Sequence, residues 1–423
     1  MIDNCDTMNQ TPLLRRAVWA VCIVFCLSTL PGSVSAGDIF SHETENQSYS
    51  IGLYTDIFAI EESRDGGLFI GGHAFEKNTS DHAFLMKTDT DGSVLWKKIY
   101  PTSRVVSIKE QDDGKIIGAA LDEQVNPDSP TAAITGSGYL FMTDPEGTLI
   151  WDEKLTGVAP AAILLCDDEI ILVGWRWAPA DDPEGVSGFF YRYNLSGVRI
   201  DAVEYERVSI HDIIATDDGG YLLIGNTGDP IETVFVRYGH LTKVNSTGGV
   251  EWTKTYNERS LFAITTMGDG YLIVGGTNPY GYSEGEAWAI GVSHDGSLLW
   301  EEKLQGYAAY DVAPYGGEFL IAGVTGPGNP LITSITHTGG ITDSKRLLEA
   351  DGRFTVVAPI SDGSVTVGGW SRHTGTVEGW LLTFDPDSVP TSPKPTQAPG
   401  FGVIVGALGF ASVAVWQAAK KRD

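Results

Sequence analysis

The sequence predicts an all-β fold, a seven-bladed β-propeller, from two glycine landmarks that recur along the chain with one period. The first landmark ends a short apolar run and recurs at Gly71, Gly118, Gly174, Gly225, Gly275, Gly323 and Gly368. The second is the glycine of a short turn, Asn/Asp-x-x-Gly in the clearest copies, at Gly92, Gly147, Gly197, Gly248, Gly296 and Gly339. A shared period of about fifty residues predicts a repeat architecture. Seven copies of four short strands each predict seven blades, and the 51 glycines among 423 residues suit turn-dense β structure.

Each copy is expected to hold four strands joined by tight turns. In the first copy we expect them at residues 56–61, 68–72, 82–88 and 93–100. The Asp-Gly segments between the strands supply the positive φ that hairpin turns need, which glycine adopts without steric strain. Their aspartates lack the alternating carboxylates and closing Glu of a calcium loop, so we expect turn formation and no metal.

The last copy lacks a fourth strand, and the start of the chain can supply it. Residues 48–54, SYSIGLY, precede the first copy much as residues 95–100 precede the second. We therefore expect this N-terminal strand to complete the last blade, because closing the ring removes unpaired sheet edges. The propeller is expected to span residues 45–388.

Both ends of the chain differ from the repeats. Residues 1–36 contain an arginine pair, an apolar run and a small-residue site before Gly37, which predicts a secretory signal peptide; an uncleaved N-terminal anchor is the alternative. Residues 389–398 form a Pro/Thr-rich linker. Residues 401–419 are uncharged and precede a basic tail, which predicts a C-terminal transmembrane helix that leaves the rest outside the cell.

Charge and cysteine content restrict the partners and the chemistry. The formal net charge of −27 disfavours binding to nucleic acid. Three of the four cysteines lie within residues 1–36, so removal of this segment leaves Cys166 alone and no internal disulfide is expected. We expect Cys166 to act as a small buried apolar residue.

The C-terminal segment 399–423 resembles the PGF-type sorting signal of archaeal surface proteins. The resemblance rests on Pro399, Gly400 and Phe401, followed in order by the apolar helix and the basic cluster. It implies that a membrane archaeosortase cuts near these residues and attaches the new end to a lipid. A retained transmembrane anchor is the alternative, and either one holds the protein at the cell surface.

A tryptophan follows the turn glycine by four residues in four of the copies, at Trp96, Trp151, Trp252 and Trp300. This spacing resembles the tryptophan-docking repeat of PQQ-like, quinoprotein-type propellers, which implies that the indoles pack between neighbouring blades. In the third and sixth copies Ile200 and Ile341 stand near the expected position, so aliphatic packing is expected there. Quinoprotein enzymes also carry adjacent cysteines, which are absent after residue 36, so we expect no cofactor.

No catalytic constellation is evident, which favours a binding or structural module over an enzyme. The sequence has no HExxH and no phosphate loop. Long irregular segments between the second and third strands of a copy are where recognition is expected. Two of them carry the candidate ligand-binding residues Trp177, Asp181, Asp182, Tyr280 and Tyr282, which suit carbohydrate stacking or cation binding. Loop variation without a ligand is one alternative, and an extracellular polysaccharide- or glycan-active enzyme with its site at the channel mouth is another.

Four N-x-S/T sequons predict glycosylation outside the cell, at Asn46, Asn78, Asn194 and Asn245. Asn194 and Asn245 also stand in turns, where Asn favours the backbone conformation. The partners expected for such a protein are a surface ligand or a neighbouring surface-layer protein, the archaeosortase, and the membrane at the C-terminus.

Overall fold

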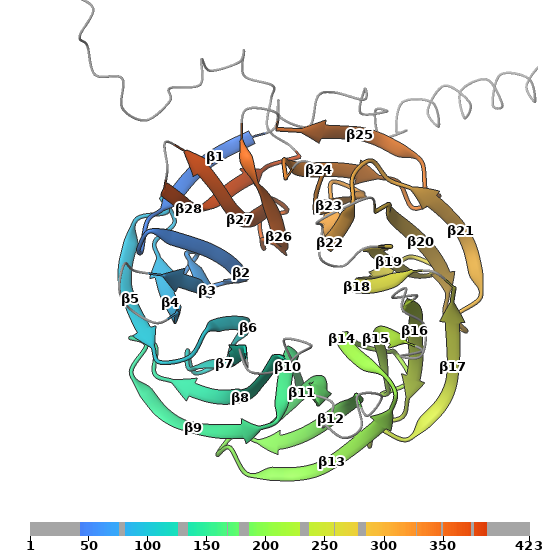
Figure 1. Cartoon of the computed structure of the whole chain (residues 1–423), viewed down its shortest axis with the longest axis horizontal. Coiled ribbons are helices and arrows are strands. Elements are labelled where there is room, and N and C mark those ends of the chain that lie inside the picture. Colours follow the sequence, from blue (N-terminus) through green and yellow to red (C-terminus); the bar gives the residue numbers. More distant parts are fainter. Residues whose placement is uncertain are drawn as a thin grey trace, which may run out of the picture. The chain divides into compact units, whose positions relative to one another are not determined.

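A computed structural model describes residues 43–386, except 76–80, 126–133, 167, 177–185, 229–236, 258, 278–284, 327, 348–349 and 374–375. Every regular element in this part of the chain is a β-strand. The strands form antiparallel sheets set around a ring, with the first strand of each group innermost (Figure 1). The predicted all-β propeller fold is confirmed at this level.

Five of the sheets have four strands each, in chain order from the inside outward. The first sheet consists of β6 (Arg104–Glu110), β7 (Ile116–Val125), β8 (Ile134–Thr143) and β9 (Leu149–Thr156). The second consists of β10 (Val158–Cys166), β11 (Glu169–Arg176), β12 (Ser187–Asn194) and β13 (Arg199–Glu206). The third consists of β14 (Ser209–Ala215), β15 (Tyr221–Gly228), β16 (Arg237–Val244) and β17 (Val250–Tyr256). The fourth consists of β18 (Ser260–Met267), β19 (Gly270–Gly276), β20 (Ala287–Ser293) and β21 (Leu298–Lys303). The fifth is β22 (Ala308–Tyr315), β23 (Glu318–Val324), β24 (Pro330–Ile335), β25 (Ile341–Arg346).

The remaining strands form one eight-stranded sheet that joins the two ends of the repeat region. One group is β2 (Tyr54–Glu62), β3 (Leu68–Phe75), β4 (His82–Thr88), β5 (Val94–Tyr100), and the other is β26 (Asp351–Pro359), β27 (Val365–His373), β28 (Thr376–Phe384), β1 (Glu43–Tyr49). Between β2 and β28 the pairing is a single parallel bridge, Tyr54 with Val377. Six paired positions instead join β1 to β28 in antiparallel register.

The N-terminal strand therefore pairs with the last repeat as expected, but it begins and ends five residues earlier than predicted. Residues 51–53 form a bend that connects β1 to β2. Two hydrogen bonds hold the bend: Leu53 N–H donates to the Phe75 carbonyl at 2.8 Å, and Ile51 N–H donates to Thr55 Oγ1 at 3.0 Å. These bonds take the backbone of residues 51–53 out of the sheet.

The recurring glycine lies where the inner strand bulges against the second strand. Every inner strand has a register shift at this point. A Cβ at Gly225 would lie 1.7 Å from the Ser209 carbonyl oxygen, so only glycine allows this approach without a shift of the backbone. The same contact recurs at 1.9–2.4 Å for Gly72, Gly174, Gly275, Gly323 and Gly369. The structural landmark is thus Gly72 and Gly369 rather than Gly71 and Gly368, and Ala120 rather than Gly118 in the second copy.

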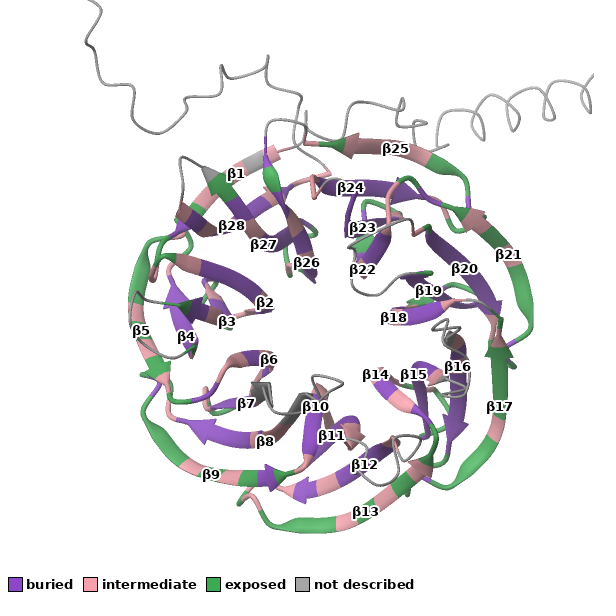
Figure 2. Ribbon diagram, in the orientation of Figure 1, coloured by how far each residue is buried: buried purple, intermediate pink, exposed green. Residues whose placement is uncertain are grey.

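The apolar core lies between neighbouring groups of strands. Each cluster of buried side chains among the described residues draws on two adjacent groups, as in the cluster of Phe69 and Leu85 with Val105 and Phe141. The middle strands are mostly buried, the inner strands mix buried and half-buried residues, and the outer strands alternate between exposed and half-buried residues (Figure 2). Each sheet therefore packs both faces against neighbouring sheets, and only its outermost strand is largely exposed to solvent.

Candidate functional site

The inner strands enclose a central cavity of about 590 Å³. The extra residue at the bulge of each inner strand lines this cavity. These residues are Phe58, Val106, Ala161, His211, Phe262, Tyr310 and Thr355. A bulge redirects the side chain of its extra residue, so the repeat places one variable residue from each inner strand around the cavity.

Aromatic bulge residues form a continuous wall along one part of the cavity. His211, Phe262 and Tyr310 come from the consecutive inner strands β14, β18 and β22, and all three side chains are half-buried. The ring centroids are 6.0 Å apart between His211 and Phe262 and 5.9 Å apart between Phe262 and Tyr310. Trp175 of β11 stacks on His211 and supports the wall, with centroids 5.3 Å apart.

Two aspartates follow bulge residues and bridge adjacent inner strands. Asp212 Oδ2 accepts the backbone N–H of Ile264 at 3.1 Å, and Asp311 Oδ2 accepts that of Val357 at 2.8 Å. The other oxygen of each carboxylate accepts the N–H of the next residue in its own strand. Ser107 makes the equivalent bridge, since its Oγ accepts the N–H of Ile163 at 3.1 Å.

The cavity walls remove water from both carboxylates, which raises their pKa values. The pKa of Asp212 is raised to about 6, chiefly by burial and against the hydrogen bonds from backbone N–H groups. Burial raises the pKa of Asp311 to about 7, and the charge of Asp212 adds to that shift. The positive charge of Lys109 acts against both shifts.

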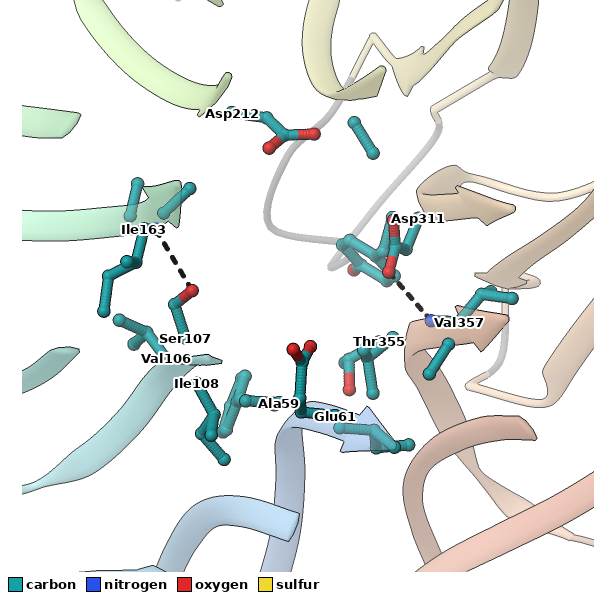
Figure 3. Close-up of a pocket in the computed structure, with 18 of the residues that line it drawn as sticks. Ala59, Glu61, Val106, Ser107, Ile108, Ile163, Asp212, Asp311, Thr355 and Val357 are labelled. Atoms are coloured by element: carbon teal, nitrogen blue, oxygen red, sulfur yellow. Dashed lines mark hydrogen bonds between the residues drawn. The ribbon is translucent and has the colours of Figure 1, made fainter. Parts of the chain in front are cut away.

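A charge pair stands across the cavity from Asp212. Lys109 Nζ donates to Glu61 Oε2 at 2.6 Å, and both residues line the cavity. Glu61 and Asp212 direct their carboxylates into the cavity from opposite sides, on β2 and β14 (Figure 3). Because Lys109 neutralises Glu61, the cavity holds less net negative charge than its count of acids suggests.

A buried ion pair lies at the junction where the ring closes. Arg353 Nη2 donates to Asp56 Oδ2 at 2.9 Å, and the Asp56 side chain is only 1% exposed. Burial raises the pKa of Asp56, and Arg353 opposes that rise. The Arg353 guanidinium lies 5.8 Å from the Phe58 ring and 5.9 Å from the Tyr310 ring, so it connects the aromatic wall to the ring closure.

The candidate ligand-binding residues predicted from the loops lie outside the described residues: Trp177, Asp181, Asp182, Tyr280 and Tyr282. The sequence reasoning missed the bulge residues because it looked for irregular loops rather than for one irregular position inside a regular strand. That position lies thirteen or fourteen residues before the structural glycine landmark, as Phe262 does before Gly275. Aromatic residues at four of the seven such positions were the available signal.

The four repeated tryptophans lie against the turn glycine of the next group of strands. A Cβ at Gly147 would lie 2.7 Å from the Trp96 ring, and Gly197, Gly296 and Gly339 stand in the same relation to Trp151, Trp252 and Trp300. Trp96 Nε1 donates to the Pro145 carbonyl at 3.1 Å, Trp151 Nε1 to Leu195 at 3.2 Å and Trp300 Nε1 to His337 at 2.9 Å. These contacts join each outer strand to the neighbouring turn.

The expectation of aliphatic packing by Ile200 and Ile341 is wrong. These residues are 51% and 38% exposed, because the alternation of the outer strand turns them toward solvent. At the first of the two interfaces the turn glycine Gly248 lies against Phe190 and Val203 instead.

A tyrosine hydroxyl at the far end of the outer strand makes a second contact that the sequence reasoning missed. Tyr205 donates to the Gly248 carbonyl at 2.8 Å. The same bond to the next turn glycine is made by Tyr49, Tyr100 and Tyr256 at 2.9–3.1 Å. Burial raises the pKa of Tyr205, so the hydroxyl stays protonated as a donor.

We predict that Tyr205→Phe lowers the free energy of unfolding by about 1 kcal/mol, since it removes one half-buried hydrogen bond and leaves the ring in place. Chemical denaturation of the full chain at pH 7 measures this loss. Tyr100→Phe and Tyr256→Phe, which remove the same bond at two other interfaces, should give losses of similar size. Unchanged stability in all three variants would contradict a stabilising role for the hydroxyl.

The other predicted positions are placed as follows. Asn194 and Asn245 stand in turns, where their side-chain oxygens accept backbone N–H groups two and four residues ahead. Asn46 lies exposed on β1, and its Oδ1 accepts Trp380 Nε1 at 2.8 Å. Cys166 is half-buried at the end of β10. Asn78, the sorting signal at Pro399, Gly400 and Phe401, and the expected helix 401–419 lie outside the described residues.

The described residues contain neither a metal site nor a membrane-spanning helix. No group of three or more His, Cys, Asp or Glu side chains in this part of the chain is placed to hold a metal ion. The described ranges also contain no helix of the length and hydropathy needed to cross a bilayer.

Comparison with known proteins supports the fold. No protein-family model and no curated protein matches the chain. Among solved structures, the WD40 β-propeller domain of Doa1 matches with a TM-score of 0.51 at 11% identity, covering 80% of this chain and 97% of that domain. The Dos1 propeller matches with a TM-score of 0.48 at 14% identity, covering 77% of this chain and 78% of the other. The chain is therefore similar in fold to WD40-type β-propellers.

Proposed function

We propose that this protein is a cell-surface binding module that holds its ligand at the mouth of the central cavity. The observation that carries the proposal is the aromatic wall of His211, Phe262 and Tyr310 on the cavity, with carboxylates from β2, β14 and β22 beside it. Pockets that hold small ligands are typically about 300–1,000 Å³, largely apolar, with a few convergent polar groups. A purely structural ring would not need half-exposed rings around its axis.

The finer architecture is part of the same proposal. Seven blades follow if the eight-stranded sheet is counted as two blades joined by the single bridge at Tyr54. In this proposal a C-terminal anchor, with or without archaeosortase processing, holds the propeller outside the cell, where a neighbouring surface protein or glycan is the partner.

A glycan-active enzyme is the second candidate, and the raised pKa values of Asp212 and Asp311 favour it. A carboxyl group with a pKa near neutrality can act as a general acid or base. Both oxygens of each residue, however, accept backbone N–H groups. This arrangement accounts for the two residues as bridges between strands, so we place the binding module first.

The proposal predicts that Phe262→Ala weakens retention of cell-envelope material by at least tenfold relative to wild type. The full chain is reconstituted in lipid nanodiscs and immobilised, and an envelope extract is passed over it while bound mass is recorded by surface plasmon resonance. Leu299→Ala is the matched control, because Leu299 is 52% exposed on the outer strand β21. Equal retention by wild type and Phe262→Ala would contradict binding at the cavity. Failure of a membrane-impermeant biotin reagent to label the protein on intact cells would contradict the surface location.

A further inference from the structure

We infer that the ligand of the central cavity is a neutral carbohydrate, which stacks on the wall of His211, Phe262 and Tyr310 and is hydrogen-bonded by the polar groups of the cavity. The inference rests on the proposed function and names the class of ligand for that site.

The aromatic wall has the form that a sugar ring needs. Its three rings come from three consecutive inner strands, and neighbouring centroids are about 6 Å apart (6.0 and 5.9 Å). Each ring is half-buried, so it is held by its neighbours while part of its surface remains accessible. The C–H groups on one face of a sugar are weakly positive and pack against the negative face of an aromatic ring.

The polar groups of the cavity match the hydroxyl groups of a sugar. A hydroxyl both donates and accepts hydrogen bonds, so its site must offer donors and acceptors together. The cavity lining supplies the ammonium of Lys109, the carboxylate of Glu61 and the hydroxyl of Ser107. Behind the lining, Asp56 holds the Arg353 guanidinium near the Phe58 and Tyr310 rings, which fixes the position of these two cavity residues.

The charges of the site argue against an anion or a metal ion as the ligand. Lys109 pairs with Glu61 at 2.6 Å and Arg353 pairs with Asp56 at 2.9 Å, so these two positive charges are compensated. Asp212 and Asp311 are partly protonated near neutral pH, and the backbone N–H groups of their own and neighbouring strands occupy their oxygens. An anion would find no uncompensated cation here, and a metal ion would find no set of unoccupied carboxylates among these residues.

The size of the cavity limits the ligand. A volume of about 590 Å³ is in the middle of the range of about 300–1,000 Å³ for small-molecule pockets. One or two sugar units fit such a space, and a longer chain would have to leave it through the mouth. The end of a glycan or a short oligosaccharide is therefore the form expected to bind.

Saturation-transfer NMR tests this inference on the full chain in lipid nanodiscs, which avoids detergents with sugar headgroups. The probes are maltose, cellobiose, lactose and N,N′-diacetylchitobiose, with glucuronic acid and choline as charged comparisons. We expect at least one neutral disaccharide to receive saturation and neither charged probe to do so. Phe262→Ala should weaken that binding at least tenfold, whereas Phe262→Tyr, which keeps the ring, and the outer-strand control Leu299→Ala should stay within threefold of wild type. A thermal unfolding midpoint close to that of wild type shows that each variant is folded.

The outcomes separate this inference from the proposed function. Binding of choline or glucuronic acid alone, or neutral-sugar binding that Phe262→Ala leaves unchanged, would overturn the inference. If no neutral sugar binds while envelope material is still retained in a Phe262-dependent manner, the ligand class is wrong and the binding module stands. If neither occurs, both fail. Free monosaccharide signals in the same spectra would support the sugar site and assign it to the enzyme candidate.

Discussion

Gly225→Ala is expected to lower the free energy of unfolding by about 3 kcal/mol, the upper range for overpacking a close contact. The added Cβ would lie 1.7 Å from the Ser209 carbonyl oxygen and 3.0 Å from the Ile210 Cα, both backbone atoms of the inner strand β14. Neither can rotate away, so β14 has to move relative to β15. Urea denaturation of the full chain at pH 7 measures the change.

Gly268→Ala is the matched control, because a Cβ at Gly268 meets no atom within 4 Å and the residue has no positive φ. We expect its effect to stay within about 0.5 kcal/mol, as for most surface substitutions. Ala120 occupies the position equivalent to Gly225 in the second sheet. The requirement for glycine at position 225 therefore comes from the local separation of β14 and β15. A loss of unfolding free energy below about 1 kcal/mol for Gly225→Ala would contradict the prediction and show that this separation adjusts easily.

Replacement of Asp212 and Asp311 by Asn together is expected to remove a large pH dependence of stability. The pKa values of these residues are raised in the folded state, to about 6 and about 7, and unfolded aspartate has a pKa near 3.9. Between about pH 4 and pH 7 the folded chain therefore binds protons that the unfolded chain has released. Since stability falls with pH wherever the native state holds more protons, this contribution is present at low pH and is lost as pH rises through 6 and 7.

Between pH 5 and pH 8 the free energy of unfolding of the wild-type protein should fall by about 2 kcal/mol more than that of the double variant. This figure takes about half of the full linkage value, because partial solvent access screens both charges. Urea denaturation at the two pH values, in one buffer of constant ionic strength, gives the difference. Asp201→Asn is the control, since Asp201 makes the same bond to the next N–H but stands 46% exposed on the outer strand β13. A double variant with the same pH dependence as wild type would show that the two carboxylates are solvated.

The regular parts of the fold were predictable because each repeat has the same local sequence pattern of apolar runs and turn residues. In the first copy the third strand was predicted with its observed bounds, and the second and fourth strands with one boundary each. Short apolar runs and positive-φ glycines in turns act over a few residues, so their effect can be predicted from the local sequence. The N-terminal strand was misplaced because its register depends on pairing with β28, which is more than three hundred residues away.

The candidate site was far less predictable. Ligand binding was predicted in the long loops because they vary in length, and the candidate residues in those loops lie outside the described ranges. Phe262 and Tyr310 line the cavity, but in the sequence they cannot be distinguished from other apolar strand residues. Only the register shift at each bulge, set by the strand beside it, turns these side chains toward the axis.

By itself the sequence determined the all-β class, the period and the strand-and-turn unit, since these follow from short apolar runs and from glycine in turns. The tertiary structure alone decided which recurring glycine is sterically required, how the two ends of the repeat region pair, and which side chains meet at the central cavity. The physical reason is that carbonyl contacts, strand register and the loss of water around Asp212 and Asp311 arise between segments distant in the chain. They exist only once the ring has closed.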